Sequence, residues 1–259
     1  WAWYKDGRKI DLGGGLVVVG RTSLLPAIED ALVSRELYLS TADALLGGRP
    51  YTDYGLVDAG DWGVAPSYGA TGGMEHTPYA FVDSRQGVAY KSLPEHEYLH
   101  AWFSAAIGYP HIGEMIVGEG PATYLEGVVR AEAGGGPQYL QEWVAYLCEW
   151  AADASTAATY PAWAPLADDV DPPLIYGPGL PYAAGALALY DFSSHELGDP
   201  AALAPVLGDI VRDLPPGAYS FGDLVDEIEF RTGAEMDMYM PWVTQTEIST
   251  AAEACDVLP

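Results

Sequence analysis

Two histidines and two glutamates near the middle of the chain have the residue types and the spacing of a metal site. His96 and His100 are four residues apart, so on a helix their imidazoles share one face and can reach the same cation. Glu97 then lies beside the metal, where its carboxylate can take a proton from bound water. A third ligand is expected from a second helix, and Glu119 fits, with eighteen residues between it and His100. The sequence therefore predicts a hydrolase site that holds one zinc ion per chain.

The scarcity of histidine supports this interpretation. The whole chain has five histidines, and two of them fall in this motif. The alternative is a solvated helix that carries two histidines without binding a metal. Zinc is inferred from the ligand types, because two imidazoles and a carboxylate, with a fourth position open for water, are the donors of catalytic zinc sites.

The metal-binding residues require a helix, and the sequence predicts one over residues 93–107, ended by Gly108 and Pro110. Before this helix, residues 16–19 are an apolar run typical of a buried strand, and residues 24–46 have apolar positions at helical spacing. Shorter strands are expected at residues 51–57 and 79–82.

Beyond residue 113 nearly every segment predicts helix. A long irregular stretch at residues 156–181, rich in Pro, Asp and Gly, suits either the rim of a binding cleft or a surface connection. The helices are expected over residues 114–133, 137–152, 181–197, 200–213 and 221–232.

These elements predict an α+β fold in a single domain over residues 1–259. A mixed α/β N-terminal lobe with the metal-binding helix is expected at residues 1–110, and a mainly helical C-terminal lobe at residues 111–259. The metal site is expected between the lobes, because clefts between lobes are common ligand sites.

The charge of the chain limits its partners. Acidic residues outnumber basic ones, 37 to 11. Such a surface repels phosphate groups, so we expect no nucleic acid and no anionic membrane as a partner, whereas an amine-bearing ligand is attracted. A saline or extracellular environment is an alternative cause of this charge. The apolar runs are shorter than the roughly 18 residues that span a bilayer, so no membrane insertion is expected.

The first residue and the cysteines bear on location. The chain begins at Trp1 without an initiator Met or a charged-then-apolar leader, so we expect a processed product or part of a longer protein. An extracellular or periplasmic location is favoured. Cys148 and Cys255 form one disulfide or remain two separate buried thiols, and their spacing does not suit a metal cluster.

Three motifs in order along the chain resemble those of the gluzincin metallopeptidases. The first is the His-Glu-x-x-His motif with its later glutamate. Upstream, the segment from Gly72 and Gly73 to His76, GGMEH, resembles the GxMEN motif of the aminopeptidase N family and, more closely, the GGxEH motif of the glycyl aminopeptidase family. Downstream, YAAG from Tyr182 to Gly185 resembles the YxKG motif of both families. The resemblance implies a thermolysin-like catalytic domain.

The resemblance also implies roles for individual residues. Glu97 is expected to act as general base and then as the acid that protonates the leaving amine. Tyr182 is expected to donate to the carbonyl oxygen as it becomes anionic, with an ordinary core tyrosine as the alternative. Glu75 is expected to bind the α-ammonium group of the substrate, unless it is a turn residue. His76 either contacts the substrate, orients Glu75 or is structural. The motif's glycines suit an edge strand that substrate backbone approaches.

Position along a helix adds one candidate residue to the site, and three residues in or near the motifs differ from the family pattern. Glu126 follows Glu119 by two helical turns and can accept a hydrogen bond from the N–H of a metal-bound imidazole, or it is a surface charge. Gly118 stands where the aminopeptidase N group usually has Asn, Pro121 replaces a larger residue, and Ala184 replaces the Lys of YxKG. These departures bear on substrate positioning, because the ligands and the base are all retained.

Together these observations predict a zinc aminopeptidase that removes small N-terminal residues, Gly or Ala, from peptides with a free N-terminus. Two alternatives belong to other classes. One is a weakly active or inactive relative that binds peptides or a protein through its acidic cleft. The other is a thermolysin-like endopeptidase, for which the amine-binding carboxylate would be unnecessary. Nothing in the sequence sets the oligomeric state.

Overall fold

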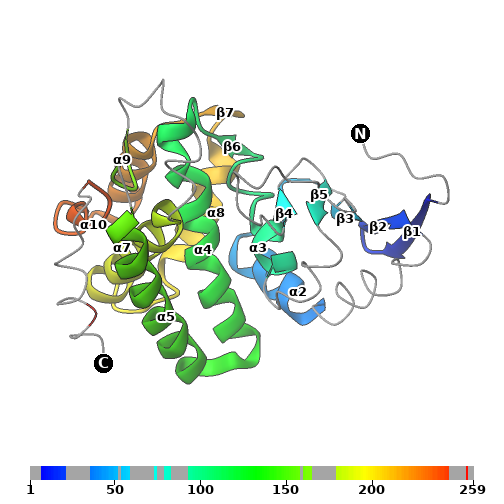
Figure 1. Ribbon diagram of the computed structural model, residues 1–259, viewed down its shortest axis with the longest axis horizontal. Coiled ribbons are helices and arrows are strands. Elements are labelled where there is room, and N and C mark those ends of the chain that lie inside the picture. Colours follow the sequence, from blue (N-terminus) through cyan, green and yellow to red (C-terminus); the bar gives the residue numbers. More distant parts are fainter. Residues whose placement is uncertain are drawn as a thin grey trace.

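The computed structural model combines helices and strands, as the α+β assignment predicted (Figure 1). A five-stranded sheet is built from the first third of the chain, with β2, β3 and β5 parallel and with β1 and β4 antiparallel to their neighbours. The described residues are 7–21, 36–51, 54–58, 73–74, 79–82, 93–157, 160–164, 179–244 and 255.

The strands follow the apolar segments of the sequence. The order in the sheet is β1-β2-β3-β5-β4, so β4, which carries Gly73, is an edge among the described strands, as the motif's glycines predicted. Val17, Val18 and Leu56 are buried in it, which confirms the expected strands around them. The strand bounds are β1 Gly7–Gly13, β2 Leu16–Arg21, β3 Tyr54–Asp58, β4 Gly73–Met74 and β5 Tyr79–Val82.

Helix α2, Glu36–Leu45, confirms the second half of the helix expected at residues 24–46. It buries Tyr38, Leu39 and Ala42 against the core. The helix stops at two glycines with positive φ, a conformation that other residues adopt only at a cost. The first half of the expected helix lies outside the described residues.

Helix α3, Leu93–Leu99, is shorter than the helix predicted over residues 93–107, and that prediction was wrong at its C-terminal end. After α3 the chain turns back on itself through Ser104, whose φ is +80° and whose N–H donates to the carbonyl of Ile107 at 2.9 Å. Trp102 and Phe103 are fully buried by this turn. Burial of two large aromatic side chains therefore outweighs the helical spacing that the sequence shows.

The second half of the chain is mainly helical, as predicted. A two-stranded sheet pairs β6, Ile107–Gly108, at the start of this half with β7, Gly217–Ala218, just before α9. The helices are η2 Ile112–Glu114, α4 Ile116–Arg130, η3 Ala131–Gly135, α5 Gly136–Ala157, α7 Leu180–Glu196, α8 Leu203–Asp213, α9 Phe221–Thr232 and α10 Pro241–Thr244.

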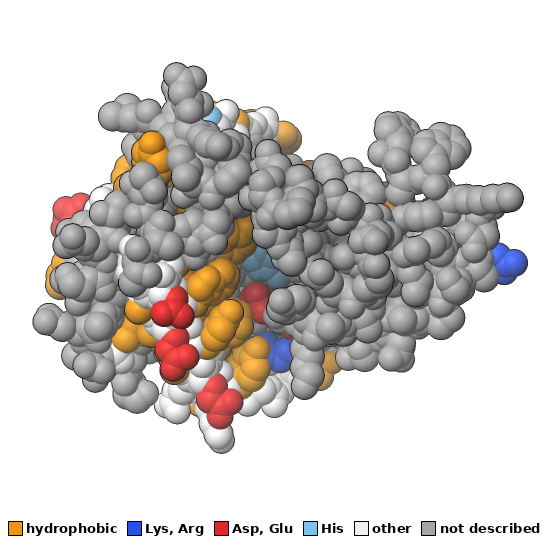
Figure 2. All heavy atoms as spheres, in the orientation of Figure 1, with side chains coloured by type: hydrophobic (Ala, Val, Ile, Leu, Met, Phe, Trp, Pro, Cys, Tyr) orange, Lys and Arg blue, Asp and Glu red, His pale blue; other side chains and the backbone are white. Residues whose placement is uncertain are grey.

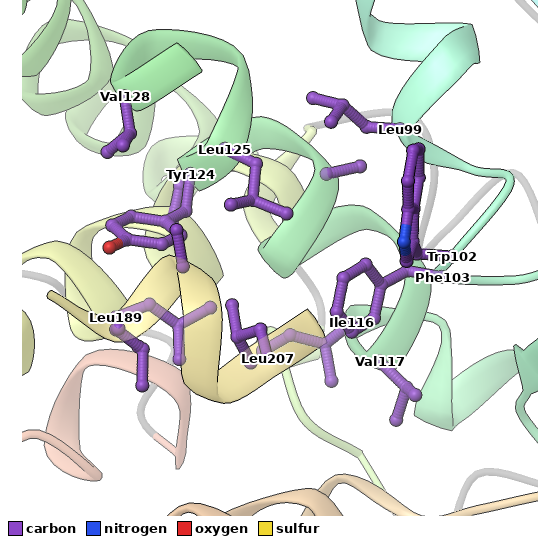
Figure 3. Packing of buried hydrophobic residues seen from close by; sticks show 14 of the residues in the cluster. Leu99, Trp102, Phe103, Ile116, Val117, Tyr124, Leu125, Val128, Leu189 and Leu207 are labelled. Atoms are coloured by element: carbon purple, nitrogen blue, oxygen red, sulfur yellow. The ribbon is translucent and has the colours of Figure 1, made fainter. Parts of the chain in front are cut away.

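Helix α4 runs through the core and is buried over nearly its whole length. Figure 3 shows Tyr124 and Leu125 of α4 beside Leu189 of α7 and Leu207 of α8. In Figure 1 the five-stranded sheet lies at one end of the molecule and α4, α5 and α7 lie toward the other, with α3 between them. The division into two lobes at residue 110 stays a prediction.

Cys148 and Cys255 form a disulfide with Cα atoms 6.0 Å apart, which decides between the two alternatives left by the sequence. The bond closes a loop of 107 residues and attaches the C-terminal residues to α5, which restricts the unfolded chain. Among the described residues, no helix combines the length and the apolar character needed to cross a bilayer.

Candidate active site

Three side chains predicted as metal ligands meet at one point between α3 and α4. His96 lies on α3, His100 directly follows that helix, and Glu119 lies in the first turn of α4. Nε2 of His96 lies 3.1 Å from Nε2 of His100 and 3.2 Å from Oε2 of Glu119. Nε2 of His100 is also 3.2 Å from that oxygen. The three donor atoms therefore form a nearly equilateral triangle.

This triangle fits a tetrahedral zinc ion. A regular tetrahedron with metal–ligand distances of about 2 Å has edges of about 3.3 Å, close to the three separations observed here. Two imidazoles and a carboxylate are the donors that zinc prefers. Among the described residues this is the group of His, Cys, Asp and Glu side chains that could hold a metal.

The carboxyl group of Glu119 is suited to bind a cation because it stays ionised. Burial alone raises its pKa, but the charges and hydrogen bonds of His100 and His96 outweigh burial and lower the pKa to about 2. Glu119 is therefore a carboxylate throughout the neutral range, although its side chain is buried.

Glu126 holds the first histidine in place. Its Oε2 lies 3.3 Å from Nδ1 of His96, the contact that two helical turns between Glu119 and Glu126 led us to expect. A proton on Nδ1 is thereby directed to Glu126, which leaves the lone pair of Nε2 for the metal. Glu126 is buried, so it is not a surface charge.

The turn after α3 holds the second histidine. Nδ1 of His100 lies 3.2 Å from the carbonyl oxygen of Phe103 and 3.3 Å from Oγ of Ser104. Here too Nε2 is left to face the other ligands. The residues predicted from the sequence did not include Phe103 or Ser104. In the predicted helix the carbonyl of Phe103 would point along the helix axis, away from the side chain of His100.

The same turn explains the glycine that departs from the family pattern. A Cβ atom at Gly118 would lie 2.1 Å from Oγ of Ser104 and 3.4 Å from Cε1 of Tyr109. Ser104 thus occupies the space that a side chain at position 118 would need. Pro121 is accommodated inside α4, and Ala184 is fully buried in the core, where a lysine would lose its hydration.

Glu97 is buried on α3, directly after the first ligand, with 4% of its surface exposed. Tyr54 of β3 responds to its charge: burial is the main cause that raises the pKa of the Tyr54 hydroxyl, and the negative charge of Glu97 is the second. The carboxylate of Glu97 is therefore close enough to the Tyr54 hydroxyl to act on it electrostatically. No spacing in the sequence points to Tyr54.

Tyr182 lies beside the metal ligands. It lies in the first turn of α7, which follows Gly179 with its φ of +71°, and its ring stacks on that of His96 with centroids 5.9 Å apart. Its ring also lies 5.6 Å from that of Trp150 of α5, measured between centroids. The half-buried Tyr182 therefore packs against the small buried cluster of Met115 and Ala164 and also reaches His96.

Of the remaining predicted residues, the structure describes one. Gly73 is described as part of β4, whereas Gly72, Glu75 and His76 lie outside the described residues.

An ion pair between a buried carboxylate and a partly exposed guanidinium joins α3 to α4. Glu95, fully buried and next to the first ligand, pairs with Arg130 at the end of α4. The guanidinium of Arg130 lies 5.2 Å from the centre of the Tyr38 ring of α2. The orientation of the ligand helix is therefore set by two other helices.

Solved structures of other proteins share the fold of this chain. The chain matches no protein-family model, and no curated protein matches it. Native leukotriene A4 hydrolase from Saccharomyces cerevisiae has a TM-score of 0.74 at 16% identity, over 92% of this chain and 39% of that one. The M1 zinc metallopeptidase from Deinococcus radiodurans has a TM-score of 0.66 at 19% identity, over 93% of this chain and 51% of that one. A variant of the latter, bound to a Tyr-Ser-Ala substrate, has the same TM-score of 0.66 at 20% identity.

These identities show the fold alone. The chain has the fold of part of these proteins and spans between about two fifths and one half of their lengths. The shared region includes nearly all of this chain.

Proposed function

We propose that the chain is a zinc-dependent aminopeptidase that hydrolyses the first peptide bond of substrates with a free N-terminus. The observation that carries the proposal is the triangle of His96, His100 and Glu119 donor atoms, 3.1 to 3.2 Å apart, with Tyr182 stacked against one of the histidines. The fold shared with zinc metallopeptidases supports it.

Each of the chain's own residues has a distinct part in the proposed reaction. His96, His100 and Glu119 would hold the zinc, which when bound polarises a carbonyl group and lowers the pKa of water. Glu97 takes a proton from the attacking water and passes it to the nitrogen of the leaving amine. The hydroxyl of Tyr182 donates to the carbonyl oxygen as that oxygen gains negative charge.

Recognition of the free amine is assigned to Glu75, which follows β4 in the sequence. A carboxylate there would bind the α-ammonium group and so measure the substrate from its N-terminus. The edge position of β4 supports this proposal, because an edge strand offers backbone groups to an extended peptide. Small first residues, Gly or Ala, are proposed from the GGxEH motif.

The test compares free and blocked substrates on one preparation. Glycyl and alanyl chromogenic amides and their N-acetylated forms are assayed with and without a chelator, after the bound zinc has been quantified. We expect about one zinc per chain and chelator-sensitive hydrolysis of the free-amine substrates alone. Equal hydrolysis of the acetylated forms would overturn the aminopeptidase in favour of an endopeptidase. Bound zinc without turnover would overturn the enzyme in favour of a peptide-binding protein.

A further inference from the structure

A row of aromatic rings leads away from the metal site along α5. Trp150 lies 5.6 Å from Tyr182, Tyr146 lies 5.8 Å from Trp150, and Trp143 lies 5.4 Å from Tyr146, measured between ring centroids. The row begins at Tyr182, whose ring stacks on a metal ligand, His96. These four rings, Tyr182, Trp150, Tyr146 and Trp143, are called the aromatic row below.

The aromatic row lies beside the fully buried face of α5, and its two tryptophans are only partly packed against the core. Val144, Leu147 and Ala151 form that buried face, with at most 3% of their surfaces exposed. Tyr146, in contrast, is 50% exposed, and Trp143 and Trp150 are half-buried. Half of the Tyr146 surface and part of each tryptophan therefore stay open to a ligand.

Two glycines leave the space in which the tryptophans of the row pack. A Cβ atom at Gly127 of α4 would lie 2.1 Å from Cδ1 of Trp143, and one at Gly179 would lie 2.6 Å from Cζ2 of Trp150. Each indole therefore rests on backbone, in a place that a side chain would fill. The row is fixed in position before any ligand arrives, which reduces the entropy lost on binding.

Acidic side chains accompany the row. Glu142 and Glu149 each precede one of its tryptophans, Asp153 lies three residues after Trp150, and all three are exposed. Figure 2 shows hydrophobic side chains in a row beside acidic ones, leading toward a histidine. An aromatic surface flanked by carboxylates favours aromatic side chains and, by charge and by cation–π contact, the side chains of Arg and Lys.

The row lies on the leaving-group side of the metal site. Helix α3 contacts both β4 and α4, and α4 in turn contacts α5, so the two ligand helices separate β4 from the row (Figure 1). Under the proposed function, the substrate amine binds next to β4. The part of the substrate beyond the scissile bond then extends in the opposite direction, over α5.

We propose that the aromatic row binds the C-terminal part of a peptide substrate and selects peptides with Arg, Lys or aromatic side chains there. This inference rests on the proposed function. An extended peptide advances about 3.3–3.6 Å per residue, so Tyr146, two ring steps beyond Tyr182, is reached about three residues after the scissile bond. Selection at this distance distinguishes long peptides from dipeptides.

The test measures peptide binding directly. Zinc-loaded Glu97→Gln protein, which should not consume its ligand, is titrated by calorimetry with two peptide amides, Gly-Ala-Ala-Arg-Phe and Gly-Ala-Ala-Ser-Ser. We expect the first to bind about five- to tenfold more tightly. Adding Tyr146→Ala should remove most of that difference, and adding Glu149→Lys should weaken binding of the Arg-containing peptide alone. Phe230→Ala, which removes an 84% exposed aromatic side chain of α9, is the matched control and should preserve the difference.

The outcomes separate this inference from the proposed function. Equal affinity for the two peptides, or a preference that survives both Tyr146→Ala and Glu149→Lys, would overturn the aromatic row as a binding site. Wild-type turnover of Gly-Ala-amide is measured in parallel. If turnover is absent and the preference is present and depends on Tyr146, the row binds peptides and the proposed catalysis is wrong.

Discussion

Replacing Gly185 by Ala should disturb the position of Tyr182 by forcing α7 away from α4. A Cβ atom at Gly185 would lie 2.9 Å from Cα of Gly120 and 2.9 Å from Cγ1 of Ile116. Ordinary carbon contacts need about 3.5 Å, so the helices must separate by about half an ångström or more. The nearest obstacle is backbone, which cannot move aside as a flexible side chain can.

The expected loss of stability follows from two opposing effects. Overpacking of a core costs about 1–3 kcal/mol, and replacing Gly by Ala inside a helix returns up to about 1 kcal/mol. The net destabilisation of Gly185→Ala is therefore about 1–2 kcal/mol, which for a domain of this size lowers Tm by about 2–8 °C. Gly120→Ala should be milder, because its nearest obstacle, Cα of Gly185, is at 3.2 Å.

The assay combines thermal unfolding with kinetics on the zinc-loaded protein. Because Tyr182 lies three residues before Gly185 on α7, its hydroxyl should shift relative to the metal ligands, and kcat should fall more than KM rises. Gly222→Ala is the control, since its Cβ would meet nothing closer than 3.6 Å. Gly185→Ala protein as stable and as active as Gly222→Ala protein would refute the close approach of the two helices as the reason for this glycine.

Four further outcomes are expected. Glu97→Gln should retain zinc, measured by metal analysis, and lose about 10²–10⁴-fold in kcat; near-normal turnover would remove Glu97 from the mechanism. Tyr182→Phe should lower kcat more than it raises KM, and a change in KM alone would make the residue a binding group. Ser104→Ala should weaken zinc binding about tenfold in a chelator competition, because His100 loses one of its two Nδ1 contacts; an unchanged Kd would show that the Phe103 carbonyl suffices. Burial raises the pKa of Asp191 to about 6, so ionisation of this residue opposes folding increasingly as pH rises from about 4 to 6. Asp191→Asn should therefore stabilise the protein by about 1–3 kcal/mol at pH 7.5 and little at pH 4. Equal changes in Tm at the two pH values would contradict this.

Residues whose relation is local could be predicted from the sequence. His96 and His100 belong to one helical face, so their four-residue spacing is enough to bring them together. Glu126 was found the same way from Glu119, and its contact with His96 is present. The helices after residue 113 were predicted for the same reason, since their apolar spacing is regular over many turns.

Residues that depend on the path of a turn could not be predicted. The carbonyl of Phe103 reaches His100 only because α3 stops at Leu99 and the chain folds back, and no proline or glycine marks that stop in the sequence. Trp150 reaches Tyr182 across the gap between α5 and α7, which no spacing along either helix reveals. Local patterns located the chemistry, and tertiary packing supplied its surroundings.

The short sequence Gly-Glu-Gly around the third ligand depends both on local spacing and on tertiary packing. Gly118 is small because Ser104, in the turn that orients His100, fills the adjacent space. Gly120 is small because Gly185 of α7 comes within backbone contact. Glu119 is therefore fixed between the turn that holds the second histidine and the helix that carries Tyr182. One residue of α4 thus sets the relative positions of the metal ligands and the tyrosine. A side chain added at Gly118 should lower zinc affinity through His100. A side chain added at Gly120 should instead weaken transition-state stabilisation through Tyr182.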